Sequence, residues 1–94
     1  MTITRTNRLG LVYTITPLEG WESIACVVEM RGGKKMRFNA SVGDMSQGWY
    51  DWMNGALIQV AFPFLLASER EFIMTGLTDK EWDEMFTEKE TDNG

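Results

Sequence analysis

Apolar residues alternate with polar ones along three short segments of the first half of the chain, residues 9–15, 24–30 and 36–40. Alternation puts every second side chain on the same side of the backbone, which is typical of a strand with one buried face. Residues 16–21, with a proline and a glycine, and the pair 32–33, two glycines, have the composition of reversing turns. The first half therefore predicts an antiparallel three-stranded β-meander, in the order 1-2-3.

The register of this sheet is predicted by requiring that the apolar residues share one face. We expect a four-residue loop at 17–20 and a three-residue loop at 32–34, whose glycines can adopt positive φ. A two-residue turn at 32–33 is rejected because it pairs apolar with basic residues. The predicted pairs are Tyr13–Ile24, Leu11–Cys26, Leu9–Val28, Met30–Met36, Val28–Phe38 and Cys26–Ala40. On the outer face this register places Arg8, Glu29 and Arg37 side by side.

A one-sided sheet of this size needs a cover, and residues 44–86 carry the signals of helices. Asp44 or Ser46 is expected to cap a first helix, which Asn54-Gly55 ends. Its apolar residues at helical spacing are Met45, Trp49, Trp52, Met53 and Ala56. Residues 57–62 predict a further helical turn that Pro63 stops.

Two capping-box phrases follow, Ser68-Glu69-Arg70-Glu71 and Thr78-Asp79-Lys80-Glu81. In such a box the hydroxyl and the carboxylate each satisfy an unpaired amide at the start of a helix. We expect two short helices separated by a glycine stop at Gly76. Their apolar anchors are Phe72, Ile73, Trp82, Met85 and Phe86.

The predicted architecture is a single α+β domain, a three-stranded meander at 8–40 followed by three or four short helices at 44–86, packed on one face. Residues 1–7 are polar and are expected to be a frayed N-terminus. Residues 87–94 are polar and acidic, and are expected to be a disordered tail.

The chain has one cysteine and no histidine. This excludes an intramolecular disulfide, zinc sites built from cysteine and histidine, and serine–histidine or cysteine–histidine catalytic pairs. Its longest apolar run is too short to cross a bilayer, and its polar N-terminus does not resemble a signal peptide. The sequence predicts a non-catalytic cytoplasmic protein without cofactor, metal site or membrane contact.

Charged residues are unevenly distributed along the chain. Residues 1–40 carry six Lys/Arg and three Asp/Glu, whereas residues 41–94 carry three Lys/Arg and eleven Asp/Glu. The acidic half favours a protein partner with a basic surface, although most of its carboxylates also suit the first turns of helices. Tryptophan and methionine side chains are common at adaptable interfaces, but core packing is the favoured interpretation of their spacing. The candidate protein-contact residues are Glu69, Glu71, Asp79, Glu81, Asp83, Glu84, Trp49 and Trp52.

Two alternatives to an acidic protein-binding surface stay open. The basic turn could touch nucleic-acid phosphates through Arg31, Lys34, Lys35 and Arg37, although these side chains also serve simply to keep a hairpin tip soluble. The third predicted strand is a free sheet edge, which would allow a structural homo-oligomer.

The C-terminal part also carries a sequence phrase that resembles other proteins. It contains Ile58-Gln59, Phe62-Pro63, Glu69-Arg70-Glu71-Phe72, Thr75-Gly76 and Glu81-Trp82-Asp83, followed by Phe86. In this phrase, over residues 55–86, the chain resembles a group of small bacteriophage-encoded proteins to which no function is assigned. The resemblance implies a phage genome and a host cytoplasm as the setting, and it implies no catalytic residue. Together with the acidic half of the chain, this setting favours a small non-catalytic phage accessory protein that binds another macromolecule, and an anti-defence inhibitor with an acidic, phosphate-like surface is one specific version.

Overall fold

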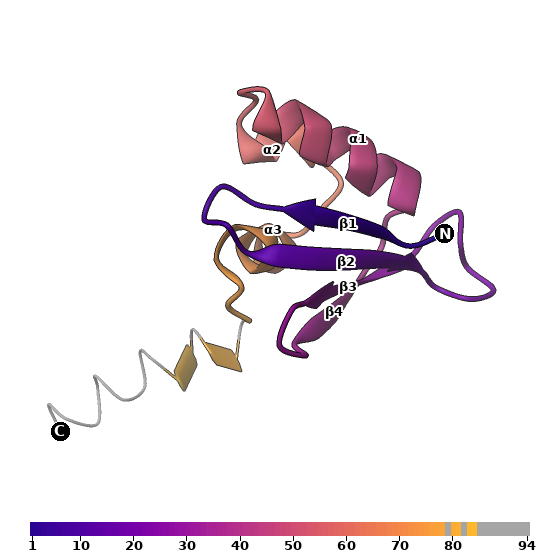
Figure 1. Ribbon diagram of the computed structural model, residues 1–94, viewed down its shortest axis with the longest axis horizontal. Coiled ribbons are helices and arrows are strands. Elements are labelled where there is room, and N and C mark those ends of the chain that lie inside the picture. The colour runs from indigo at the N-terminus through magenta and orange to yellow at the C-terminus, as the bar shows by residue number, and fades with distance from the viewer. Residues whose placement is uncertain (79, 82, 85–94) are drawn as a thin grey trace, which may run out of the picture.

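The computed structural model describes residues 1–78, 80, 81, 83 and 84, and in them the chain forms a four-stranded antiparallel sheet with helices on one face (Figure 1). The sheet order is β1-β2-β3-β4. The elements are β1 (Ile3–Thr6), β2 (Val12–Pro17), β3 (Cys26–Met30), β4 (Lys35–Phe38), α1 (Val42–Met53), α2 (Ile58–Ala61) and α3 (Ala67–Thr75). The predicted α+β class with an antiparallel meander is confirmed. The expected anchors Trp82, Met85 and Phe86 and the expected tail at 87–94 lie outside the described residues.

The prediction of a frayed N-terminus and of only three strands was wrong, because residues 3–6 form β1. This strand pairs with β2, with Ile3 opposite Ile15 and Thr6 opposite Val12. Arg5 shares a face with Ile3, and its Nη2 donates to Ser46 Oγ of α1 at 3.0 Å. Only one apolar residue lies in this strand, so the alternation that reveals the other strands is too weak to show it.

Asn7 joins the β1–β2 turn to the end of α3. Its Nδ2 donates to the carbonyls of Ile73 and Met74 at 2.9 and 3.0 Å, and its Oδ1 accepts from the amides of Leu9 and Leu11, both at 2.9 Å. The side chain is only 5% exposed. One amide therefore satisfies two carbonyls that the last turn of a helix leaves without partners, together with two amides of a turn.

The predicted β2–β3 pairs were wrong, although the predicted buried face was right. Tyr13 lies opposite Met30 and Ile15 opposite Val28, because the connecting loop spans 18–25, closed by a 3.1 Å hydrogen bond from Leu18 N to Ala25 O. The partner of Tyr13 thus moves from residue 24 to residue 30. An even shift keeps each side chain on its face. Leu9 and Ile24, which the predicted register placed on the buried face, lie outside the strands and are exposed.

The β3–β4 pairs also differ by two residues from the prediction. Val28 lies opposite Met36 and Cys26 opposite Phe38, around a tight turn at 31–33 in which Met30 N donates to Lys34 O at 2.7 Å. The predicted outer row does not form. Glu29 lies opposite Lys35 and Arg37 opposite Val27, while Arg8 lies in the β1–β2 turn and donates to the Trp52 carbonyl.

Three helix boundaries show which capping predictions hold. Helix α1 is capped by Ser41, whose Oγ accepts from Asp44 N at 3.1 Å, and not by Asp44 or Ser46. Helix α3 begins after Leu66, whose amide donates to Glu69 at 2.8 Å, so the predicted Ser68–Glu71 box was wrong. The second box is confirmed, since Thr78 N donates to Glu81 at 2.9 Å and Glu81 N donates to the Thr78 hydroxyl at 3.3 Å.

The helical stops are also confirmed. Asn54 caps the end of α1 and is followed by Gly55 at φ 107°, α2 ends just before Phe62-Pro63, and Gly76 caps the end of α3 in the left-handed region. Residues 80, 81, 83 and 84 are helical as well.

One hydrophobic core lies between the sheet and the helices. Its fully buried members are Tyr13, Ile15, Cys26, Val28, Phe38, Met45, Phe62, Phe72 and Ile73, with Trp49 and Trp52 at 2% and 5% exposure. Helix α1 approaches the chain at 61–62 so closely that a Cβ added to Gly48 would lie 2.6 Å from the ring of Phe62 and 2.8 Å from the carbonyl of Ala61. Glycine at position 48 therefore permits the packing of α1 on α2.

Candidate protein-contact surface

Trp49 and Trp52 belong to the core and not to a contact surface. The Trp49 indole Nε1 donates to the carbonyl of Thr6 at 3.0 Å, and the two tryptophan rings meet edge to face, with their centroids 5.4 Å apart. The Arg8 guanidinium covers the Trp52 ring at 5.7 Å from its centroid. Both indoles therefore connect α1 to β1 and to the turn that follows it, which agrees with the prediction from their spacing that they pack in the core.

The acidic candidates do not form one free surface. Glu69 is only 6% exposed and accepts the Leu66 amide at the start of α3, so it serves the fold. Glu71 is half-buried on α3, while Asp83 and Glu84 are exposed. Asp79 lies outside the described residues. Of the predicted acidic set, Asp83 and Glu84 are therefore the described carboxylates that are fully open to a partner.

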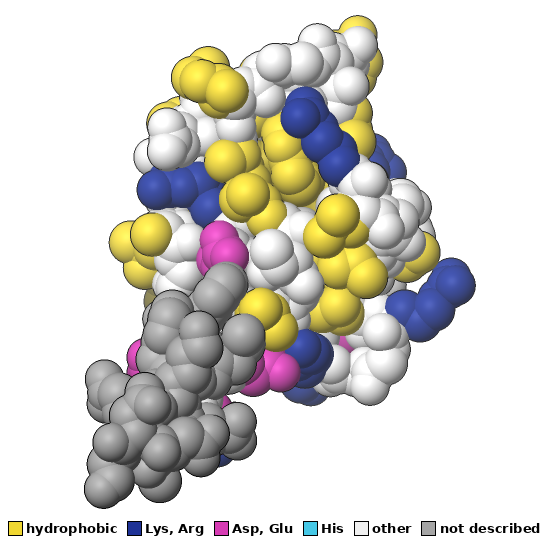
Figure 2. Space-filling view, turned by 90° about the vertical axis from the view of Figure 1, so that its left-hand side faces the viewer, with side chains coloured by type: hydrophobic (Ala, Val, Ile, Leu, Met, Phe, Trp, Pro, Cys, Tyr) yellow, Lys and Arg dark blue, Asp and Glu magenta, His cyan; other side chains and the backbone are white. Residues whose placement is uncertain are grey.

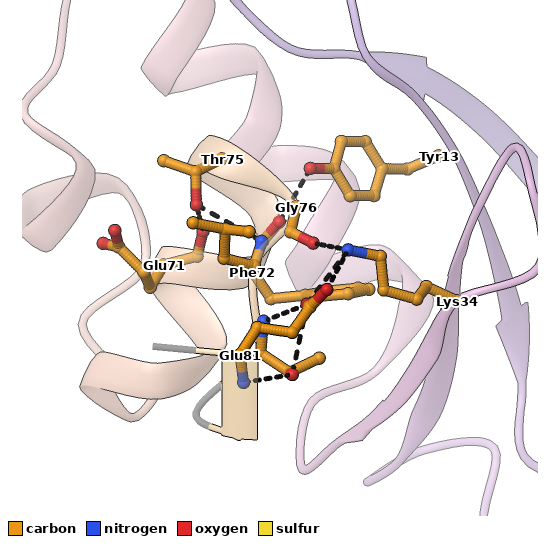
Figure 3. A network of polar contacts seen from close by, with 9 residues as sticks. Tyr13, Lys34, Glu71, Phe72, Thr75, Gly76 and Glu81 are labelled. Atoms are coloured by element: carbon orange, nitrogen blue, oxygen red, sulfur yellow. Dashed lines mark hydrogen bonds and ion pairs between the residues drawn. The ribbon is translucent and has the colours of Figure 1, made fainter. Parts of the chain in front are cut away.

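Glu81 is held by a polar network at the end of α3 (Figure 3). Its carboxylate accepts the Thr78 amide at 2.9 Å and the Lys34 ammonium at 3.0 Å. The backbone amide of Thr78 contributes most, followed by Lys34, to holding the pKa of the Glu81 carboxyl below its usual value. The ion pair is well exposed on both sides, so its contribution to stability is small.

Lys34 connects the tip of the β3–β4 hairpin to this network. Its Nζ donates to the carbonyl of Gly76 at 2.6 Å as well as to Glu81, as Figure 3 shows. A cation at the C-terminal end of a helix interacts favourably with the helix dipole. Lys34 is therefore engaged within the molecule, whereas Arg31, Lys35 and Arg37 of the predicted basic set are exposed.

Sequence analysis missed an exposed group of large apolar side chains between the end of α1 and the start of α3. Its members, here called the apolar band, are Tyr50 (65% exposed), Met53 (40%), Leu57 (70%), Val60 (67%), Phe64 (41%) and Leu66 (64%). Figure 2, which views the molecule from the left-hand side of Figure 1, shows several groups of hydrophobic side chains on this face, with Lys and Arg side chains beside them.

The packing beneath the apolar band fixes its shape. Phe62 lies edge to face with both Trp49 and Trp52, at 6.1 and 6.0 Å between centroids, and Phe64 meets Phe62 at 6.1 Å. Helix α2 is a single turn held on α1 through Gly48, so Leu57 and Val60 project from a segment that packs directly on α1. An exposed apolar surface is a feature of protein-binding sites.

The buried Tyr13 phenol and Cys26 thiol both have raised pKa values. Burial raises the pKa of the Tyr13 phenol to about 12, and the hydroxyl donates to the carbonyl of Phe72 at 2.7 Å. Burial raises the pKa of the Cys26 thiol to about 11. Both groups are therefore neutral near pH 7 and act as core residues. In the described part of the chain, no three Asp, Glu, Cys or His side chains come together as a metal site would require.

Comparison of the chain with protein-family models, with curated proteins and with solved structures finds no match. Among the described residues, no helix is both long enough and apolar enough to span a bilayer.

Proposed function

We propose that this chain is a small non-catalytic accessory protein that binds another protein through the apolar band. The observation that carries the proposal is the exposure of six large apolar side chains, each 40–70% exposed, within residues 50–66. Singly exposed apolar residues are ordinary on soluble proteins, whereas a clustered set marks a contact surface. The six come from α1, from α2 and its N-cap, and from the segment before α3, and α1 packs directly on α2 at Gly48.

The acidic residues supply the second part of the proposal. Asp83 and Glu84 are exposed, and the half of the chain that contains both them and the apolar band carries three basic against eleven acidic residues. Charge at the edge of an interface steers association and selects partners more than it adds affinity. A partner with an apolar patch and a separate basic surface fits this combination. The resemblance to phage-encoded proteins makes a bacterial host protein, such as a defence enzyme that the chain inhibits, one specific form of the proposal.

The absence of histidine and the neutral, core-packed state of Tyr13 and Cys26 support a binding role over a catalytic one. A homo-oligomer is the second candidate, favoured by the same apolar band and by the position of β4 at the edge of the sheet.

The test compares two charge-changing double variants in affinity capture from bacterial extract treated with nuclease. Leu57→Glu/Val60→Glu places charge in the apolar band at two exposed positions, so the fold is expected to be preserved. Asp83→Lys/Glu84→Lys is the matched control, which changes two exposed residues away from the band. We expect the first variant to lose the captured protein and the second to retain it at reduced association rate.

Two outcomes would contradict the proposal. Retention of the partner by the Leu57→Glu/Val60→Glu variant would show that the band is not the contact. A concentration-dependent dimer of the wild type in sedimentation equilibrium, made monomeric by the same substitutions, would assign the band to self-association.

A further inference from the structure

A cavity of about 440 Å³ opens on the sheet at the end opposite the 31–33 turn. It is lined by Trp21, Ile24, Ala25, Arg37 and Asn39. The first three residues come from the β2–β3 loop, and Arg37 and Asn39 come from β4 and the residue after it. In Figure 1 this loop lies at the right-hand end of the sheet, near the N-terminus, while α1 and α2 lie above the sheet and α3 lies behind β2. The cavity is distinct from the apolar band.

The β2–β3 loop presents a tryptophan from a compact, hydrogen-bonded turn. The Trp21 amide donates to Leu18 O at 2.9 Å, and the Trp21 carbonyl accepts from Ile24 and Ala25 at 3.0 and 2.8 Å. Yet the indole is 59% exposed and the Ile24 side chain 57% exposed. An indole beside a branched aliphatic chain, held in place while still largely in water, offers a stacking surface for a flat ring.

Cations line the strand that borders this surface. Residues 36 and 38 of β4 face the core, so Lys35 and Arg37 share the open face, about 7 Å apart along the strand. Both side chains are exposed. The Asn39 carboxamide, at the cavity, carries both hydrogen-bond donors and acceptors. The site thus combines an aromatic platform, a row of positive charge and a polar group that can pair with a base edge.

We propose that this cavity binds single-stranded nucleic acid, with a base stacked on Trp21 and Ile24 and adjacent phosphates on Arg37 and Lys35. Aromatic stacking together with a positively charged track is the combination by which proteins hold single strands without strict sequence preference. The site differs from the basic turn suggested by the sequence alone, because Lys34 is engaged with Gly76 and Glu81.

The charge of the surroundings is compatible with this ligand. Residues 1–40, which form the sheet and its loops, carry three more basic than acidic residues, whereas the acidic excess of the chain lies in residues 41–94. Helices α1 to α3 pack on the other face of the sheet. Three carboxylates lie nearer: Glu19 and Glu22 in the same loop and Glu29 opposite Lys35. They weaken the positive field, so the site is expected to bind only at low salt.

The test measures fluorescence anisotropy of a labelled oligodeoxythymidine of about 12 nucleotides, in a series of salt concentrations. For two phosphate contacts, the slope of log K against log salt should be about −1.4 for a single strand. Trp21→Ala should weaken binding about tenfold, and Trp21→Phe should largely restore it, because loss of one stacked base costs about 1–3 kcal/mol. Arg37→Gln should reduce the slope by about 0.7.

Lys80→Gln is the matched control, since it removes an exposed positive charge outside the cavity and should leave the affinity for the oligonucleotide unchanged. Three outcomes with nucleotide ligands would overturn the proposal. They are absence of oligonucleotide binding at low salt, equal affinity of the wild type and Trp21→Ala, and equal affinity for thymidine monophosphate and for the strand. The last would assign the cavity to a free nucleotide. The proposal would also be overturned if the oligonucleotide did not bind while an acidic peptide that contains tryptophan bound to the wild type and not to Trp21→Ala.

Discussion

Replacement of Asn7 by alanine tests the account of how the first strand is held to the helical layer. The side chain makes four hydrogen bonds of 2.9–3.0 Å to backbone groups of the β1–β2 turn and of the end of α3, and it is 5% exposed. Each such bond contributes about 0.5–1.5 kcal/mol net, and loss of the amide leaves four backbone groups without it. We therefore expect Asn7→Ala to lower the free energy of unfolding by about 3 kcal/mol.

For a chain of this length such a loss lowers the melting temperature by about 15 °C. The assay is urea unfolding followed by circular dichroism and by the fluorescence of the buried tryptophans, together with a thermal scan. Asn39→Ala is the matched control, since this asparagine is exposed, and its effect should stay within about 0.5 kcal/mol. A loss below about 1 kcal/mol in Asn7→Ala, similar to that of the control, would refute the argument that this amide joins the two layers.

Further predictions concern a close helix contact, an ionisable network and a buried thiol. Gly48→Ala should destabilise the protein by about 2–3 kcal/mol, because the added methyl meets the neighbouring ring and carbonyl, as overpacked cores do. Gly43→Ala, exposed and in the same helix, should be neutral or stabilising by up to about 1 kcal/mol in the same urea assay. The pKa of Glu81 is lowered in the folded state, so this carboxylate stabilises the fold above the ordinary glutamate pKa, and the stabilisation is lost as the pH falls through the pKa of the folded state. Lys34→Gln should raise the Glu81 pKa in an NMR titration, and an unchanged pKa would contradict the contact. Cys26, whose thiol pKa is raised to about 11 by burial, should react with a thiol reagent at pH 8 only on unfolding, and rapid labelling of the native protein would disprove its burial.

The buried face of the sheet was predictable, whereas the pairing of its strands was not. Alternation determines which side chains share a face, so Tyr13, Val28 and Phe38 were correctly expected together. The register depends on loop length, and the loop at 18–25 closes through its own backbone hydrogen bonds, which composition does not reveal. Strand β1 escaped prediction because its place is fixed by the distant contacts of Asn7 and Arg5.

The candidate sites show a similar division. Capping signals correctly predicted the role of Thr78 and Glu81 but misassigned the start of α3, because Glu69 serves an apolar N-cap residue, Leu66, that no capping rule selects. The apolar band could have been suspected from Leu57 and Val60, which share one face of a short helical turn. Which face of that turn is buried depends on Gly48 and on tertiary packing. The cavity at Trp21 joins a loop to β4 and required the fold.

Hydrogen–deuterium exchange of the chain with and without its captured partner tests the central claim most directly. Binding through the apolar band predicts slowed exchange of backbone amides within residues 50–66, with little change at residues 80–84 and on the open face of the sheet. Slowed exchange confined to residues 80–84, or to β4 and the β2–β3 loop, with residues 50–66 unchanged, would contradict the assignment of the band as the protein-contact surface.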